Sequence, residues 1–245
     1  MKRRSLPEHF GTSLKPLSLQ LFHMLLDPSL LVPTGPWWII AAQAIGIYLL
    51  VDFISGVIHW SEDRYGSEST PFVGGAIRKN ILHHHRPRHI TRITFWEAMG
   101  TTALISLGIF VFGTLAGFFG WQLVFLSLLG MNVNIVHRWA HSTPRELHPA
   151  IRILQGLRLI QTPKHHALHH GLPRVTHYCA FTNWMNPVLE LIRFWRSVEW
   201  VIAVLTGIHP REDDSLPGVG STPEWILELD EEIRESARSR RSSPT

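Results

Sequence analysis

Histidine is abundant in this sequence and concentrated in a few short segments. The 245 residues include 16 histidines, and the neutral imidazole ring is the commonest metal ligand in proteins. Most of the signal lies in His83-His84-His85, in His137 to His141 and in His165 to His170. The single cysteine, Cys179, excludes a cluster held by four thiolates of one chain. The pattern therefore predicts a metal site made of nitrogen and oxygen ligands.

The spacing of these histidines predicts helical pairs. Residues four apart share one face of a helix, so His137 pairs with His141, His165 with His169, and His166 with His170. Zinc hydrolases usually carry a glutamate base between two such ligands, and Ala-Leu stands there in the last segment. Together with His59 and the loop histidines, eight or nine imidazoles favour two redox-active iron ions over a hydrolytic zinc.

Two long segments that contain no basic residues precede the main histidine segments. Neither 17–60 nor 93–136 contains Lys or Arg, and each has the length of two bilayer-spanning helices joined by a Pro or Gly turn. We therefore predict an all-α, multi-pass membrane fold with about four transmembrane helices, at about 17–33, 37–58, 100–117 and 121–137. They form two hairpins beneath a His-rich helical cap. Buried helices of a soluble α protein are the alternative reading.

All 23 Lys and Arg residues lie outside these two segments, together with almost all of the histidines. By the positive-inside rule, the metal site and both termini face the cytoplasm. The predicted organisation is a cytoplasmic tail over 1–16, a membrane domain over 17–210, and a cytoplasmic linker and charged helix over 211–245. We expect that helix, at about 222–238, to be solvated. The net charge of +4 accompanies no nucleic-acid-binding pattern, so no nucleic-acid partner is expected.

Two polar residues of the predicted spans are candidates for supporting the metal site. Asp52 lies two helical turns before His59, and Asn134 one turn before His137. Each is expected to hydrogen-bond a ligand histidine or a water near the metal, or else to link two spans. His85, His89 and His177 have no helical partner and are left out of the predicted ligand set.

Several motifs in the same order resemble the plasmanylethanolamine desaturase family, also called Kua or CarF-type proteins, which includes the plastid palmitate desaturases of plants. The resemblance covers about residues 48–213. It rests on Asp52–Trp60, Tyr65–Ser67, Pro71–Gly74, His83-His84 with Pro87 and Ile90–Arg92, Ile135–His141, Pro163–His170, Tyr178-Cys179, Trp184–Pro187 and Phe194–Gly207.

The resemblance implies a di-iron enzyme that desaturates a membrane phospholipid with O2 as co-substrate. Electrons would come from a b-type cytochrome or a ferredoxin. The implied ligands are His59, His83, His84, His137, His141, His165, His166, His169 and His170.

The sequence departs from the ether-lipid members of that family at two places. They carry Glu-Thr-Asn-Gly-Asp-Asn where this chain has Glu97 to Thr102, and a histidine where it has Arg174. An alkyl (vinyl-ether forming) and an acyl substrate both remain open. The rival readings are a di-iron membrane lipid hydroxylase and a non-enzymatic metal-binding membrane protein.

Overall fold

The computed structural model describes residues 24–25, 27–212, 223–229 and 231, and every regular element among them is helical. In chain order the elements are η1 (Pro28–Leu31), α2 (Trp37–Tyr65), α3 (Gly74–His85), η2 (Pro87–Thr91), α4 (Phe95–Leu115), α5 (Trp121–Gly130), α6 (Val133–Ala140), α7 (Pro149–Gly156), α8 (Pro163–His170), α9 (Met185–Leu191) and α10 (Phe194–Thr206). The all-α prediction is confirmed for this part of the chain.

Three stretches of the described chain are long and apolar enough to cross a membrane. They are Trp37–Tyr65, Phe95–Leu115 and Trp121–Ala140, the last made of α5 and α6 in succession. Of the four predicted spans these correspond to the second, third and fourth. The first, 17–33, lies largely outside the described residues, and its described end contains the short helix η1.

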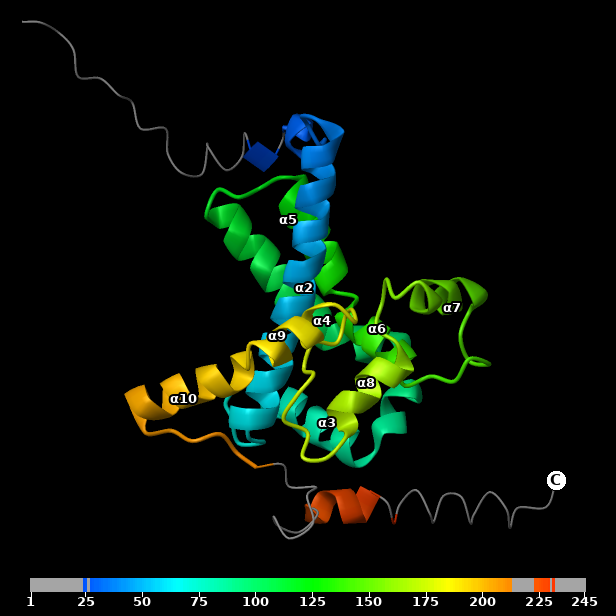
Figure 1. Ribbon diagram of the computed structural model, residues 1–245, viewed down its shortest axis with the longest axis vertical. Helices are drawn as coiled ribbons and strands as arrows, with labels where there is room; N and C mark the ends of the chain where they lie inside the picture. Colours follow the sequence, from blue (N-terminus) through cyan, green and yellow to red (C-terminus); the bar gives the residue numbers. More distant parts are fainter. Residues whose placement is uncertain (1–23, 26, 213–222, 230, 232–245) are drawn as a thin grey trace, which may run out of the picture.

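These helices form an apolar stem with the smaller helices gathered at one end (Figure 1). Packing brings α2 and α4 against α5, and α4 also against α6. Large side chains on the outer face of α4 are exposed, such as Leu104 (71%) and Phe112 (75%). In water this exposure would be unfavourable, whereas hydrocarbon accepts it. The chain is a membrane protein.

Local signals in the sequence explain where the site-bearing helices begin. Thr94 and Glu97 form a reciprocal capping box at the start of α4. Thr162 caps α8 by accepting a hydrogen bond from the backbone N–H of His165, and Pro163 occupies the first turn. These caps fix the residues at which α4 and α8 begin.

The loop between α8 and α9 is fastened to α2 by a buried carboxylate. Asp52 accepts hydrogen bonds from the backbone N–H of Phe181 (3.0 Å) and Thr182 (2.8 Å), from the Thr182 hydroxyl and from the N–H of Met185 (3.3 Å). One turn later, Gly56 permits close approach, because a Cβ there would lie 2.5 Å from Cys179 Sγ. Buried backbone donors are costly when unpaired, so Asp52 holds this loop at α2.

Candidate metal centre

Two groups of potential ligands lie side by side where α2, α3, α6 and α8 meet. The first, called here the five-histidine group, is His83, His137, His141, His166 and His170. The second, called the mixed group, is His59, Asp63, His84 and His169. Within each group the ligand atoms all lie within 4.8 Å of one another. Rings of the two groups are neighbours, since the centroids of His169 and His170 are 5.4 Å apart.

The separations between ring nitrogens match a metal coordination shell. Metal–imidazole bonds of about 2.1 Å place adjacent ligand nitrogens about 3.0 Å apart at right angles and about 3.4 Å apart at tetrahedral angles. In the five-histidine group, His166 Nε2 lies 2.9 Å from His137 Nε2 and 3.1 Å from His170 Nε2. His170 Nε2 is also 3.1 Å from His83 Nε2. The nitrogens thus converge as ligands of one ion do.

The mixed group adds one carboxylate to three imidazoles. Asp63 Oδ1 lies 3.4 Å from His84 Nε2, and Asp63 Oδ2 lies 3.5 Å from His169 Nε2 and 3.7 Å from His59 Nε2. The other side of the carboxylate is fixed by Asn80, whose Nδ2 donates to Oδ1 at 2.5 Å. This second contact holds Asp63 in the orientation that a ligand requires.

Backbone carbonyls set the tautomer of two ligand histidines. His59 Nδ1 lies 3.1 Å from the carbonyl oxygen of Tyr178, and His169 Nδ1 lies 2.9 Å from that of Thr176. A carbonyl only accepts, so Nδ1 carries the proton and Nε2 presents its lone pair to the centre. His59 Nε2 and His141 Nε2 are buried and have no hydrogen-bond partner among the described residues. One metal ion in each group would satisfy these two nitrogens.

The donor set fits iron better than a structural zinc. Five imidazoles exceed the four ligands of a tetrahedral zinc site and leave one position open in an octahedral shell. No thiolate takes part, because the buried Cys179 belongs to neither group. The structure thus supplies two adjacent, nitrogen-rich groups that could each hold a metal ion.

Burial keeps the histidines of the two ligand groups neutral. Burial first, and neighbouring imidazoles second, lower the pKa of His141 to about 4 and that of His170 to about 2. The same causes hold the pKa values of His83, His166 and His169 well below 6.5. Neutral rings are the form that binds metal, so protons do not compete for the folded site near pH 7.

Acid is therefore expected to destabilise the metal-free chain. Each of these histidines has a lower pKa folded than unfolded, so below about pH 6.5 the unfolded state binds more protons and is favoured, by up to about 1.4 kcal/mol per pH unit per group. The thermal unfolding midpoint of the metal-free chain in detergent is expected to fall by roughly 10 °C or more between pH 7.5 and 5.5. A midpoint that stays constant or rises over this range would contradict the buried, neutral cage.

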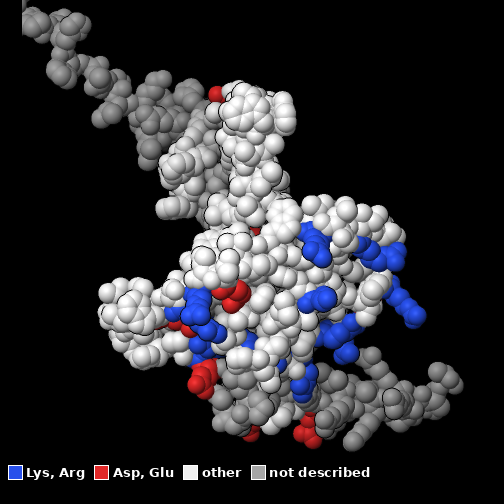
Figure 2. Space-filling view, viewed as in Figure 1, with Lys and Arg blue, Asp and Glu red and all other residues white. Residues whose placement is uncertain are grey.

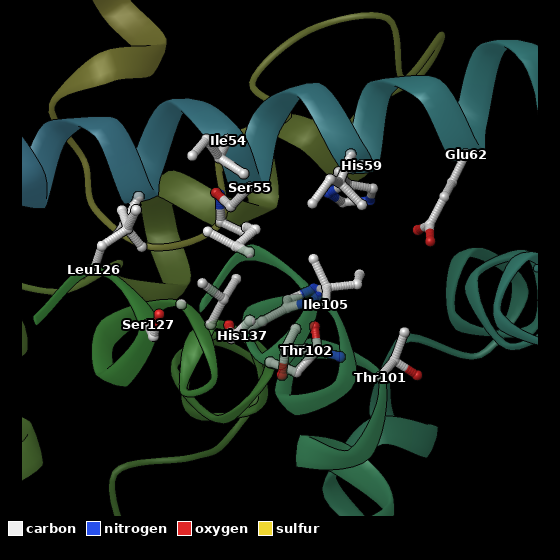
Figure 3. Close-up of a pocket in the computed structure, with 18 of the residues that line it drawn as sticks. Ile54, Ser55, His59, Glu62, Thr101, Thr102, Ile105, Leu126, Ser127 and His137 are labelled. Atoms are coloured by element: carbon white, nitrogen blue, oxygen red, sulfur yellow. The ribbon is translucent and has the colours of Figure 1, made fainter. Parts of the chain in front are cut away.

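An apolar cavity leads to this centre between α2, α4 and α5 (Figure 3). Isoleucine, valine and leucine side chains such as Ile54, Ile105 and Val133 alternate in its walls with polar ones, and His59 and His137 lie on its surface. Glu62, Thr101 and Thr102 add polar groups to the lining. Its aliphatic side chains can contact a hydrocarbon chain, and its polar groups are available to fix the orientation of a ligand.

Eight of the nine predicted ligands are brought together, and His165 is not. Its Nε2 accepts a hydrogen bond from Asn186 Nδ2 at 3.2 Å, and its ring lies 5.4 Å from that of His177. Because its helical turn points it toward α9, His165 belongs to neither group.

The two polar candidates have different surroundings from those expected. Asp52 accepts hydrogen bonds from the 181–185 loop rather than from a ligand histidine. This is close to the alternative that Asp52 links two spans, except that it links a span to a loop. Asn134 lines the apolar cavity beside His137. Asp63 was missed by the sequence analysis, although its spacing of four residues from His59 is the same signal that paired the histidines.

The fold and site define a class: a helical membrane protein with a histidine-rich cage for two metal ions at the end of a hydrocarbon-lined cavity. A family described as the lipid desaturase domain matches residues 48–213. The chain belongs to this lipid desaturase family. No solved structure matches it significantly.

Curated relatives agree with this assignment. A plasmanylethanolamine desaturase of Myxococcus xanthus is 36% identical over 74% of this chain, and plasmanylethanolamine desaturase 1 of Mus musculus is 39% identical over 68% of it. Fatty acid desaturase 4 of Arabidopsis thaliana chloroplasts is 32% identical over 77%. The match spans 66% of the Myxococcus and mouse proteins and 56% of the Arabidopsis protein, somewhat under two thirds of their lengths.

Proposed function

We propose that this chain is a membrane-bound di-iron lipid desaturase that introduces a double bond into an alkyl or acyl chain of a membrane phospholipid. The observation that carries the proposal is the placement of His59 and His137. Both belong to the ligand groups, one to each, and both lie on the wall of the apolar cavity. A chain in that cavity would therefore be next to both metal positions at once.

The overall reaction balances with O2 as the oxidant. Two hydrogens leave adjacent carbons of the lipid chain and, with two electrons and two protons from outside, reduce O2 to two molecules of water. Iron in the two groups would supply this redox chemistry. The residues of the chain hold the ions, exclude bulk water by burial and orient the hydrocarbon chain along α2 and α4.

The orientation proposed for the protein places the metal centre and both termini on the cytoplasmic side. Figure 2 supports this orientation for the metal centre, because on the face shown the blue Lys and Arg side chains gather around the lower end and leave the stem free of them. Positive charge of this kind is retained on the cytoplasmic side of membranes. An electron donor, a b-type cytochrome or a ferredoxin, would then reach the site from the cytoplasm.

The relatives indicate a lipid substrate, and they leave open whether the desaturated chain is ether-linked or acyl-linked. Relatives of both kinds are named, those acting on plasmanylethanolamine and those named fatty acid desaturases. Thr101 and Thr102, at which the sequence departs from the ether-lipid members, lie on the cavity wall. We therefore expect the substrate choice between ether-linked and acyl-linked chains to depend on this wall.

Mass spectrometry of lipids tests the proposal. Cells that express the chain are expected to accumulate a phospholipid two mass units lighter than its precursor, and the product should require oxygen. A gain of sixteen mass units would instead favour hydroxylation. Metal binding without any lipid change would favour a non-enzymatic metal-binding protein.

A further inference from the structure

The C-terminal segment beyond the family domain packs against the helix that carries two of the ligands. Residues 224–229 are helical, and Figure 1 shows this piece beneath α3. The expected helix is present here, but it is not solvated on all sides, because Ile226 is fully buried. Residues 232–238 of that expectation lie outside the described chain.

An apolar cluster makes the contact. Ile226 packs with Ile77, Ile81 and Leu82 of α3, and Trp225 and Leu229 flank it. Ile77 and Ile81 are one helical turn apart and lie on one face of α3. His83 and His84 follow Leu82 directly in the sequence, so the segment packs on the part of α3 that leads into the two ligands.

A polar contact fixes the register of the segment. Trp225 Nε1 donates to Glu68 Oε1 at 2.8 Å, and the guanidinium of Arg78 lies 4.3 Å from the centre of the Trp225 ring. Arg78 Nε is also 3.9 Å from Glu68 Oε2. Indole, guanidinium and carboxylate thus connect the segment both to α3 and to the turn that precedes it.

The same helix is joined to the metal centre through its last two turns. Asn80 donates to Asp63, His83 belongs to the five-histidine group, and His84 belongs to the mixed group. A movement of α3 away from α2 would withdraw one ligand from each group. Packing of Ile226 behind α3 opposes that movement.

From these contacts we infer that the segment around Trp225 and Ile226 is a positioning clamp, which holds α3 so that His83 and His84 reach both metal ions. Neither residue touches the ligand atoms. They act through α3, and they lie beyond residue 213, where the lipid desaturase match ends. The inference rests on one part of the proposed function, namely that both groups hold metal ions.

Metal release tests the clamp. The full-length chain in detergent is loaded with Fe2+ or Zn2+ and exposed to a chelator well below its unfolding midpoint. Ile226→Asp is expected to release both ions at least about 10-fold faster than the wild type, the scale at which groups that orient ligands alter metal binding. The two ions are expected to leave with similar acceleration, because each group loses one ligand of α3.

Three further variants separate positioning from general stability. Leu227→Asp is the matched control, since Leu227 is 54% exposed and adjacent to Ile226, and it is expected to release metal as the wild type does. Ile226→Val should restore slow release. Trp225→Phe, which loses the bond to Glu68 and keeps a smaller aromatic ring beside Arg78, should be intermediate.

Equal release from Ile226→Asp and the wild type would overturn the clamp, as would equal acceleration in Leu227→Asp. The assay does not measure lipid conversion. Faster release from Ile226→Asp therefore supports the clamp even if no lipid is desaturated, and unchanged release overturns it even if desaturation is found.

Discussion

Replacing His169 with alanine is expected to reduce lipid desaturation by more than about 100-fold and to lower the metal content of the purified chain. His169 is fully buried, and its Nε2 lies 3.3 Å from His84 Nε2 and 3.5 Å from Asp63 Oδ2. Loss of a group that merely orients a ligand costs 10–100-fold in metal affinity or activity, so loss of the ligand should cost more. Metal analysis and lipid mass spectrometry on the same preparation measure both effects.

Two controls accompany this variant. His209→Ala changes an exposed histidine and should retain full activity. His165→Ala lies on the same helix as His169 but outside both groups, so we expect it to keep two metal ions per chain. If His165→Ala loses metal as His169→Ala does, the ligand groups have to be redrawn to include it. Full lipid conversion by His169→Ala would remove the basis for a di-iron centre.

The change from Asp63 to asparagine is expected to be nearly as damaging, although it preserves the shape of the side chain. Asp63 is buried, faces three ligand nitrogens and is the only carboxylate in either group. Asparagine can still accept from Asn80, but it removes the negative charge and places an N–H donor beside His59, His84 or His169. We expect metal content to fall from two ions toward one, with activity reduced by about 100-fold.

A neighbouring carboxylate provides the comparison for Asp63. Glu62→Gln also replaces a carboxyl group on the same turn of α2 by an amide, but Glu62 lines the cavity and belongs to neither group. Its metal content should stay at two ions. If Asp63→Asn and Glu62→Gln have the same metal content, the carboxylate of Asp63 is not a ligand.

Periodicity and charge predicted much of the fold because lipid restricts the choices. A span must satisfy its backbone internally, so an apolar segment of sufficient length without basic residues is a helix, as Phe95–Leu115 is. The pairs His137 with His141 and His166 with His170 were likewise predictable, since α6 and α8 keep both members of each pair on one face.

The remainder depended on contacts between segments far apart in the sequence. The direction of His165 is set by Asn186, which lies on α9. Asp52 was expected to serve the metal, but the 181–185 loop, which the sequence does not place next to it, uses its carboxylate. Ile226 looked like one apolar residue of a charged helix, and only its packing against Ile77, Ile81 and Leu82 of α3 shows why it is buried.

Adjacent residues of one helix point about 100° apart, and this structure uses that angle to divide its ligands. His83 serves the five-histidine group and His84 the mixed group, as His170 and His169 do on α8. The rotation of α3 and α8 that suits one ion is therefore the rotation that suits the other. The first ion to bind sets that rotation for the second, so uptake of the two ions is expected to be positively cooperative, with little half-loaded protein at any point of a titration.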